Sequence, residues 1–359
     1  MKFILATGGT GGHLFPALKV AAVLKQKGHE VIFAGALSMV ETKLKDQGWA
    51  YQNFRGKGFN IRRPAQCFEA FFLMVMAYGQ SRRMLQIHKP QAVLGFGGYG
   101  SVPVVLAALS KNIPTMIHEQ NVVPGRANKL LGKWVRKIAV SFLETRKYFA
   151  AGKTIHTGCP CHVPKGQGVN KKEVRASFDL DPSDKTIFCF GGSQGSARIN
   201  QMFFDVMKSI AERIPILQII HITGKNDYEE YKRLYKEMPI KSVLFPFLDR
   251  IEDAYGIADV AVTRAGAVSI HELTAFEIPS IVIPYPHAGG HQRFNAHAFG
   301  RFRLGLVIEE EDLTFKALYD GILDRLLIRT RHFNEMDKTN IFFRADADVR
   351  LAEVLINLN

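Results

Sequence analysis

Glu272 is the carboxylate with the most informative surroundings in the sequence. The stretch ADVAVT (258–263) predicts a buried parallel strand, and Arg264-Ala265-Gly266 predicts a tight turn into a helix that carries Glu272. A second buried strand, PSIVIPYP (279–286), precedes a glycine-containing loop and another helix. The ends of such strands form the ligand edge of an open α/β sheet, where amides favour phosphate and a carboxylate accepts the hydroxyls of a diol such as ribose. The alternative is an ordinary βαβ unit with a buried glutamate.

His13 stands beside the first glycine-rich segment. KFILAT (2–7) predicts a buried strand, GGTGGH (8–13) follows it, and a helical pattern begins directly afterwards. Backbone without Cβ atoms can approach a ligand closely, and a helix start favours an anion. The spacing is neither that of GxGxxG nor that of a P-loop, which needs a Lys-Ser/Thr pair. An imidazole at this point can act as a general base, and the alternative is a histidine bonded to the backbone.

The same strand–glycine loop–helix pattern occurs at 3–20, 92–109 and 185–203. This repetition predicts an α/β protein with two Rossmann-like, doubly wound domains that face each other, rather than a solenoid. A polar stretch with proline and glycine places the linker around 160–165. We expect an N-terminal domain at 1–160, a C-terminal domain at 161–335, and a helical segment at 336–359 that packs back on the N-terminal domain.

Four polar residues end the apolar strand that begins near Ile113. They are His118, Glu119, Gln120 and Asn121. Their side chains indicate a site that reads hydroxyl and amide groups. The alternative is a polar surface loop, which the fully apolar strand before it disfavours.

The positive charge is concentrated in the first half of the chain. Residues 1–158 contain 22 Lys+Arg and 6 Asp+Glu, a net charge of +16, and the remainder contains 25 basic and 27 acidic residues, a net charge of −2. This asymmetry predicts an anionic partner surface, and no recognisable nucleic-acid module is present. The four cysteines form no CxxC pair, which argues against a disulfide framework and a zinc ribbon and favours a reducing compartment. The N-terminus runs directly into a strand and is not a signal peptide.

Residues 67–90 predict a helix that is apolar almost all round. Its apolar core spans about ten residues and is interrupted by Glu69, too short to cross a bilayer. One interpretation is a helix packed in the core. The other is a surface helix that dips into lipid, with basic residues at the level of the phosphates. Those basic residues are Arg62, Arg63, Arg82 and Arg83, extended by the cluster Lys129, Lys133, Trp134, Arg136 and Lys137.

Six motifs coincide in order along the chain: GGTGGH (8–13), GGYGS (97–101), HEQN (118–121), GGSQG (191–195), TRAGA with a glutamate (263–272), and PYPHA with HQ and NA (284–296). Together they closely resemble the MurG family of glycosyltransferases over roughly the whole chain. The resemblance implies the GT-B fold, in which two Rossmann-like domains face a cleft. It also implies transfer of N-acetylglucosamine from UDP-N-acetylglucosamine to a lipid-linked muramyl-pentapeptide in peptidoglycan synthesis.

The resemblance implies roles for individual residues. Leu248 would offer backbone groups to uracil, Ala267 to His271 would enclose the nucleotide, and Glu272 would accept the ribose hydroxyls. Ser193 would meet the diphosphate, whereas Gln292 and Asn295 would read the sugar. The implied donor-binding set is Thr10, Gly11, Gly12, Asn121, His162, Ser193, Leu248, Ala267, Val268, Ser269, Ile270, His271, Glu272, Gln292 and Asn295.

On the acceptor side, the resemblance implies that the glycine loops of the first half face the acceptor diphosphate. The corresponding residues are Gly98, Tyr99, Gly100 and Ser101, and His13 matches the family histidine often proposed as the base.

Three positions depart from the family pattern. His162 stands where the family has an arginine that contacts the donor phosphates, and an imidazole cannot form the rigid two-pronged fork of a guanidinium. Glu277 stands where a glycine is usual. Gly290 stands where an acidic residue is frequent.

The expected reaction is an inverting transfer in which the 4-hydroxyl of the acceptor attacks the anomeric carbon as UDP leaves. Helix starts and glycine-loop amides can stabilise the leaving diphosphate without a metal, so we expect no metal ion and no other cofactor. His287 and His291 have the i, i+4 spacing of a zinc pair, but they lie in a glycine loop with no evident third ligand.

Two other functions compete with this interpretation. One is a UDP-sugar epimerase on the same fold, which needs catalytic carboxylates and no lipid acceptor. The other is a non-catalytic nucleotide-sugar-binding membrane partner, for which the change at His162 is the best support. The favoured interpretation places the protein peripherally on the cytoplasmic face of the cell inner membrane. Its partners would be UDP-N-acetylglucosamine, the polyprenyl-diphosphate-linked acceptor and an anionic membrane surface, and not nucleic acid.

Overall fold

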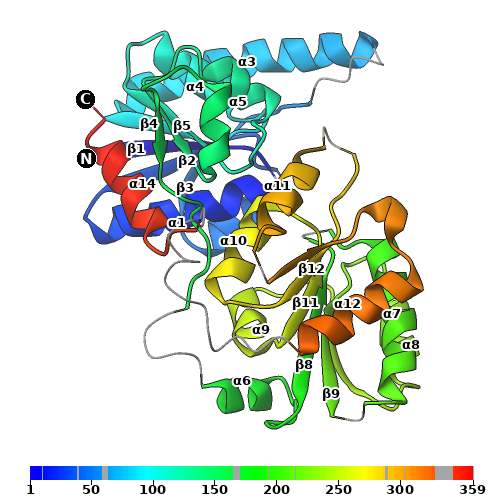
Figure 1. The fold of residues 1–359 in the computed structure, drawn as a ribbon. Helices are drawn as coiled ribbons and strands as arrows, with labels where there is room; N and C mark the ends of the chain where they lie inside the picture. Colours follow the sequence, from blue (N-terminus) through cyan, green and yellow to red (C-terminus); the bar gives the residue numbers. More distant parts are fainter. Residues whose placement is uncertain are drawn as a thin grey trace. The chain divides into compact units, whose positions relative to one another are not determined.

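The computed structural model describes residues 1–9, 11–38, 40–58, 64–164, 170–192, 194–214, 216–287, 290–302, 304–327 and 343–358. The chain divides into two compact units (Figure 1). Unit 1 comprises Met1–Cys161 together with Phe342–Asn359, and unit 2 comprises His162–Ile341. Each unit contains one sheet with helices packed on it.

The sheet of unit 1 is parallel and seven-stranded, with strand order β3-β2-β1-β4-β5-β6-β7. Its strands are β1 (Lys2–Thr7), β2 (Glu30–Gly35), β3 (Ala50–Asn53), β4 (Ala92–Gly95), β5 (Thr115–Glu119), β6 (Lys137–Val140) and β7 (Thr154–His156). Its helices are α1 (Gly11–Gln26), α2 (Glu41–Asp46), α3 (Pro64–His88), α4 (Val102–Leu109), α5 (Arg126–Leu131), the 3₁₀ helix η1 (Leu143–Tyr148) and α14 (Ala347–Ile356).

Both faces of this sheet are buried because side chains alternate along each strand. Phe3 and Leu5 on β1 point into one core, which includes residues of α1 and α14, whereas Ile4 and Ala6 point into the other, which includes residues of α3, α4 and α5. In Figure 1, α14 (red) lies beside α1 (blue), and Leu351 and Leu355 are fully buried in their shared core.

The sheet of unit 2 is also parallel, with strand order β10-β9-β8-β11-β12-β13. Its strands are β8 (Lys185–Phe190), β9 (Leu217–Ile222), β10 (Lys241–Phe245), β11 (Val260–Thr263), β12 (Ser280–Val282) and β13 (Gly305–Val307). Its helices are α6 (Lys171–Ser177), α7 (Ala197–Ala211), α8 (Tyr228–Tyr235), α9 (Ile251–Ile257), α10 (Ala267–Ala275), α11 (His291–Phe299), the 3₁₀ helix η3 (Glu310–Asp312) and α12 (Phe315–Leu326).

The two strand orders are equivalent, and both are those of a doubly wound Rossmann fold. In each sheet the order reverses between the first and fourth strands of the unit, β1 and β4 in unit 1 and β8 and β11 in unit 2. Ligands of such sheets bind at this switch point, outside the carboxyl ends of the strands. All three predicted glycine loops follow these strands, so the α/β fold with two Rossmann-like domains is confirmed, and the topology identifies the ligand-binding edges.

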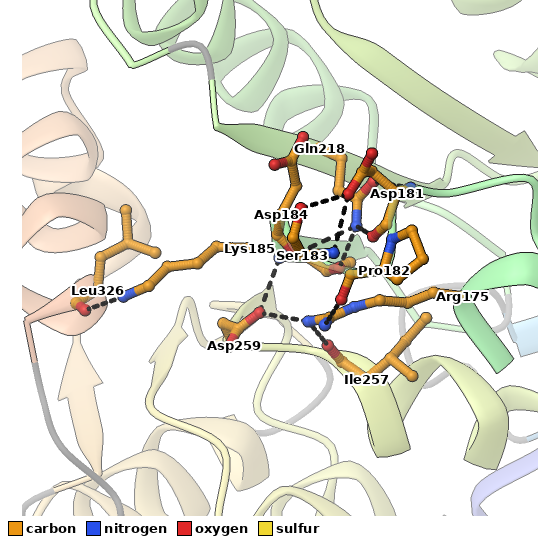
Figure 2. A network of polar contacts seen from close by, with 11 residues as sticks. Arg175, Asp181, Pro182, Ser183, Asp184, Lys185, Gln218, Ile257, Asp259 and Leu326 are labelled. Atoms are coloured by element: carbon orange, nitrogen blue, oxygen red, sulfur yellow. Dashed lines mark hydrogen bonds and ion pairs between the residues drawn. The ribbon is translucent and has the colours of Figure 1, made fainter. Parts of the chain in front are cut away.

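The opposite, amino edge of the unit 2 sheet is closed by polar contacts among its own residues (Figure 2). Arg175 on α6 donates to the carboxylate of Asp259 at 3.0 Å, and the same carboxylate accepts from the backbone N of Thr186 at 2.8 Å. Gln218 donates to the carbonyl of Asp181 at 2.9 Å. These contacts join the starts of three strands to α6 and to the segment that follows it.

Candidate active site

Arg264 joins the two segments that meet at the switch point of unit 2. Its guanidinium donates to Oγ of Ser196 at 2.8 Å and to the carbonyl of Ile283 at 3.3 Å, and it forms an ion pair with Glu310. The side chain is 7% exposed and lies over the ring of Tyr285. Arg264 thereby fixes the glycine loop after β8 relative to the turn that begins α10.

Glu272 lies on α10, and only one of its two carboxylate oxygens accepts hydrogen bonds from described residues. Oε1 accepts from the backbone N of His162 at 3.2 Å and from Nδ1 of the same residue at 2.7 Å. Within the described residues no group donates to Oε2. A carboxylate has about four acceptor sites, so Glu272 keeps capacity for hydroxyl groups although the residue is only 4% exposed.

The other predicted donor residues of α9 and α10 divide into exposed and buried ones. Leu248 is partly exposed in the turn before α9, and Val268 and Ser269 are partly exposed on the first turn of α10. Ala267, Ile270 and His271 are buried, and Nδ1 of His271 lies 2.7 Å from the carbonyl of Ala267. The side chains of these three residues face the core, so only their backbone groups can contact a nucleotide.

Two polar side chains of α11 face the strand ends. Oε1 of Gln292 accepts a hydrogen bond from the backbone N of Tyr285 at 3.0 Å, and the residue is partly exposed. Asn295 is fully buried, and its Nδ2 donates to the carbonyl of Ala265 at 3.3 Å. Asn295 therefore contacts the turn before α10, and its role in binding the sugar stays a prediction.

In unit 1, His13 lies where the first two glycine loops meet. A Cβ added at Gly98 would be 3.3 Å from Cε1 of His13, and one added at Gly8 would be 3.6 Å from the carbonyl oxygen of Gly97. Gly97 and Gly98 have φ values of +91° and +75°, which glycine adopts without strain. Burial lowers the pKa of His13 to about 4, so its imidazole is neutral at pH 7 and can accept a proton.

The HEQN segment is internal rather than a reading site. His118, Glu119 and Gln120 are at most 3% exposed. The Glu119 carboxylate accepts from the backbone N atoms of Asn121 (2.9 Å) and Gly125 (3.1 Å), and from the side-chain amides of Asn121 (3.1 Å) and Asn128 (2.8 Å). All of its acceptor sites are filled, so the expectation that these three residues read a ligand is wrong.

His118 completes this internal network. Its Nδ1 lies 3.2 Å from the amide of Gln120, and its Nε2 lies 3.1 Å from the carbonyl of Gly158. Burial lowers the pKa of His118 to about 4 and raises the pKa of Glu119. The network joins the end of β5 to the start of α5 and to the loop after β7, and it stabilises the edge from within.

The remaining predicted residues lie at the same edge of unit 1. Gly11 and Gly12 begin α1, and Asn121 is partly exposed beside Glu119. Ser101 is buried and donates to the carbonyl of Gly98 at 3.0 Å, and Gly100 is buried against Ala36. Tyr99 is exposed, and its ring lies against Gly56. Thr10 and Ser193 fall outside the described residues.

Helix α3 presents an apolar surface. Phe68, Phe71, Phe72, Val75 and Met76 are exposed. The helix also contributes Ala77, Met84 and Leu85 to the core that includes residues of α4 and of the sheet. The core-packed interpretation therefore holds for one side of the helix, and binding of its exposed apolar side to lipid stays a prediction. Arg82, Arg83, Lys129, Lys133, Trp134, Arg136 and Lys137 are exposed on unit 1, whereas Arg62 and Arg63 lie outside the described residues.

Among the described residues, no helix has the length and hydropathy needed to cross a membrane. In the same part of the chain, no three His, Cys, Asp or Glu side chains are grouped as metal ligands. Two Asp-x-Asp sequences occur, at 179–181 and 346–348. Asp181 belongs to the amino-edge network, and Asp346 is the N-cap of α14, so neither pair follows the end of a β-strand.

Three residues of the site escaped sequence reasoning. For Arg264 a signal was present in the sequence, because a charged residue directly follows an apolar strand and precedes the glycine turn. Its role in the site was not predicted from that signal. Asn128 and Glu252 gave no local signal, because each acquires its role from a residue distant in the chain. Oδ1 of Asn128 is buried beside Gly97, and Glu252 faces His162.

Comparisons with known proteins agree with this geometry. Residues 3–140 match the glycosyltransferase family 28 N-terminal domain, and residues 186–351 match the glycosyltransferase family 28 C-terminal domain. Two curated relatives carry the name UDP-N-acetylglucosamine–N-acetylmuramyl-(pentapeptide) pyrophosphoryl-undecaprenol N-acetylglucosamine transferase. The one from Geobacter metallireducens is 36% identical, over 90% of this chain and 89% of the relative, and the one from Bacillus subtilis is 33% identical, over 100% and 99%.

Solved structures show the same architecture. The crystal structure of Acinetobacter baumannii MurG has a TM-score of 0.73 and 26% sequence identity, with 99% of each chain covered. The UDP-GlcNAc 2-epimerase of Neisseria meningitidis, bound to UDP-GlcNAc, has a TM-score of 0.66 at 13% identity and covers 99% of this chain and 100% of its own. The second likeness is one of fold alone.

Proposed function

The chain belongs to the MurG family of glycosyltransferases, and from this premise we propose that it moves N-acetylglucosamine from UDP-N-acetylglucosamine to the 4-hydroxyl of a lipid-linked N-acetylmuramyl-pentapeptide, in peptidoglycan synthesis. The observation that carries the proposal is Glu272, a buried carboxylate at the switch point of unit 2 whose Oε2 has no donor among the described residues. That oxygen suits a ribose diol. The epimerase interpretation has support from fold likeness only.

The donor would be held by unit 2. The ribose hydroxyls would bind Glu272, uracil would contact the backbone at Leu248, and the diphosphate would face the glycine loop at 191–196. Arg264 holds this loop through Ser196, so the amides of the loop and of the α10 start are preorganised. Such amides stabilise the negative charge that develops on UDP as it leaves. Gln292, whose Oε1 accepts from the backbone N of Tyr285, would bind the sugar.

The acceptor would be activated by unit 1. His13 is neutral at pH 7, because burial lowers its pKa to about 4, and a neutral imidazole can take the proton of the attacking hydroxyl. The glycines beside it have no Cβ atom, so a diphosphate would be able to approach their backbone closely. Attack from the face opposite to UDP inverts the anomeric carbon.

The surface of α3 would bring the enzyme to its lipid substrate. Phe68, Phe71, Phe72, Val75 and Met76 are exposed on one helix, and basic residues are exposed on the same unit. Aromatic side chains with surrounding lysines and arginines bind the interface of an anionic membrane. We propose on this basis that the protein binds peripherally to the cytoplasmic face of the inner membrane. Phe71→Ser with Phe72→Ser should release it from anionic vesicles, whereas Phe315→Ser on unit 2 should not.

The decisive experiment is transfer itself. Purified protein is incubated with UDP-N-acetylglucosamine and a lipid-linked muramyl-pentapeptide analogue, and both UDP and the glycosylated lipid are quantified. We expect UDP to be released only when the acceptor is present, in equal amount to the product. Formation of an epimerised UDP-sugar without acceptor would contradict the transferase function, as would donor binding without turnover.

A further inference from the structure

His162, the first residue of unit 2, lies between two carboxylates. Its Nδ1 lies 2.7 Å from Oε1 of Glu272, and its Nε2 lies 3.6 Å from Oε2 of Glu252. Glu272 is on α10, and Glu252 is on the first turn of α9, directly after the turn that contains Leu248. One side chain therefore connects the two elements that would hold ribose and uracil.

Glu252 has a buried carboxylate oxygen that faces His162. Oε2 of Glu252 is buried and has no hydrogen-bond partner among the described residues, so Nε2 of His162 is the polar atom facing it. The imidazole ring has a nitrogen on each of two sides, so one side chain can face both carboxylates at once.

We propose that His162 is a positioning residue for the uridine half of the donor, which acts by bridging Glu272 and Glu252. The bridge holds Oε1 of Glu272 in place, directs Oε2 toward the ribose, and ties α9 to α10. This assignment rests on the proposed function and deepens it. It differs from the phosphate contact of the family arginine, because both ring nitrogens of His162 already face carboxylates.

Uridine and UDP separate the two roles, because uridine has the ribose and base but no phosphate. Both are tested as competitors of UDP-N-acetylglucosamine with the full chain. We expect His162→Ala to raise the donor KM and the inhibition constants of uridine and UDP by a common factor of about 10, with kcat within about twofold. Glu252→Gln should raise all three by a smaller common factor, about threefold.

Rescue and control variants complete the design. His162→Arg offers donors to both carboxylates and should restore uridine affinity to within about threefold of the original. His162→Gln has a single donor group, so its uridine affinity should lie between those of the original protein and His162→Ala. This variant replaces His162→Ala in the comparison if the alanine variant does not fold. His297→Ala removes an exposed imidazole that lies 3.2 Å from Glu309, and should leave all constants unchanged.

A loss of UDP affinity with unchanged uridine affinity would overturn the proposal, since it would place His162 on the phosphates. Unchanged affinity for both ligands in His162→Ala would overturn it as well. Calorimetric binding of uridine and UDP provides the same comparison without turnover. If the original chain failed to transfer sugar, the proposed function would be lost while these affinities would still decide the role of His162.

Discussion

Glu119 and Glu272 invite comparison between the two units, because described residues fill the acceptor sites of only one of them. Each is a buried glutamate at the carboxyl edge of a parallel sheet. Glu119 accepts four hydrogen bonds from its own unit, whereas both described bonds to Glu272 reach one oxygen. The difference teaches that a buried carboxylate near the edge of a sheet can bind a ligand only when its own unit leaves it acceptor capacity.

The largest effect should come from the catalytic side of unit 1. His13→Ala should lower kcat by about 100- to 10,000-fold, the usual contribution of a general base, while donor affinity changes little. Steady-state kinetics with both substrates measures this, with His29→Ala as the control on the same unit. A kcat within a few-fold of the original value would show that His13 is not the general base.

The pH dependence of kcat gives a second measure of His13. Burial lowers its pKa to about 4, so the imidazole stays unprotonated as pH falls from 8 to 5. We therefore expect kcat at saturating donor to show no inflection near pH 6.5, the usual histidine range, and to decline only toward pH 4. An inflection near 6.5 that disappears in His13→Ala would show that the base titrates normally.

Glu119→Gln tests the internal carboxylate. In this variant an NH2 group replaces one carboxylate oxygen. It would face N–H groups that now donate to Glu119, such as Gly125 N and Asn128 Nδ2. We expect the free energy of unfolding to fall by about 2–3 kcal/mol, with donor KM unchanged in the folded protein. Denaturant unfolding followed by circular dichroism measures it. A change in KM without a change in stability would reverse the assignment.

Glu272→Gln is the counterpart in unit 2. The amide oxygen can still accept hydrogen bonds from His162, but the amide carries no negative charge and binds hydroxyl groups more weakly. The KM for UDP-N-acetylglucosamine should therefore rise by about 30-fold, which corresponds to about 2 kcal/mol. The free energy of unfolding should change by less than about 1 kcal/mol, because no described group depends on Oε2. Thermal shift and kinetics together compare this variant with Glu119→Gln. A large loss of stability in Glu272→Gln with an unchanged donor KM would show that Glu272, like Glu119, has a structural role.

The smallest effect concerns the residue after α10. Glu277 has φ +55°, a left-handed conformation that glycine adopts without strain at the end of a helix. Glu277→Gly should stabilise unit 2 by about 0.5–1 kcal/mol, and Glu277→Ala should not, because it keeps the Cβ atom. Thermal unfolding of both variants measures the difference. An equal gain from alanine would point to the side chain rather than to the backbone.

Much of the fold followed from local pattern. The apolar runs at 2–7 and 185–190 became β1 and β8, and the glycine loops after them began helices at the switch points. The usual glycine at the position of Glu277 corresponds to a left-handed backbone, and Gly290 has φ +70° at the start of α11. The strands and glycine loops depend on residues adjacent in the chain, so sequence reasoning reached them, whereas the left-handed backbone at Glu277 and Gly290 came from the structure.

The site was less accessible to the same reasoning. HEQN indicated a reading site, but contacts with Gly158 and Asn128 occupy polar atoms of His118 and Glu119. Asn295 matched a sugar-reading position, and its Nδ2 donates to the carbonyl of Ala265. For His118 and Glu119, partners supplied by other segments decided that these polar atoms are not available to a ligand.

The sequence by itself determined two parallel-sheet units, their glycine-rich strand ends and the class of enzyme, because periodicity, turn residues and motif order are local properties of the chain. Only the tertiary structure decided that Glu119 is internal, that Glu272 keeps an oxygen for a ligand, and that His162 lies between Glu272 and Glu252. The reason is physical: a polar atom can bind a ligand only after the folded chain has met its own hydrogen-bonding requirements, and those partners lie up to 110 residues away.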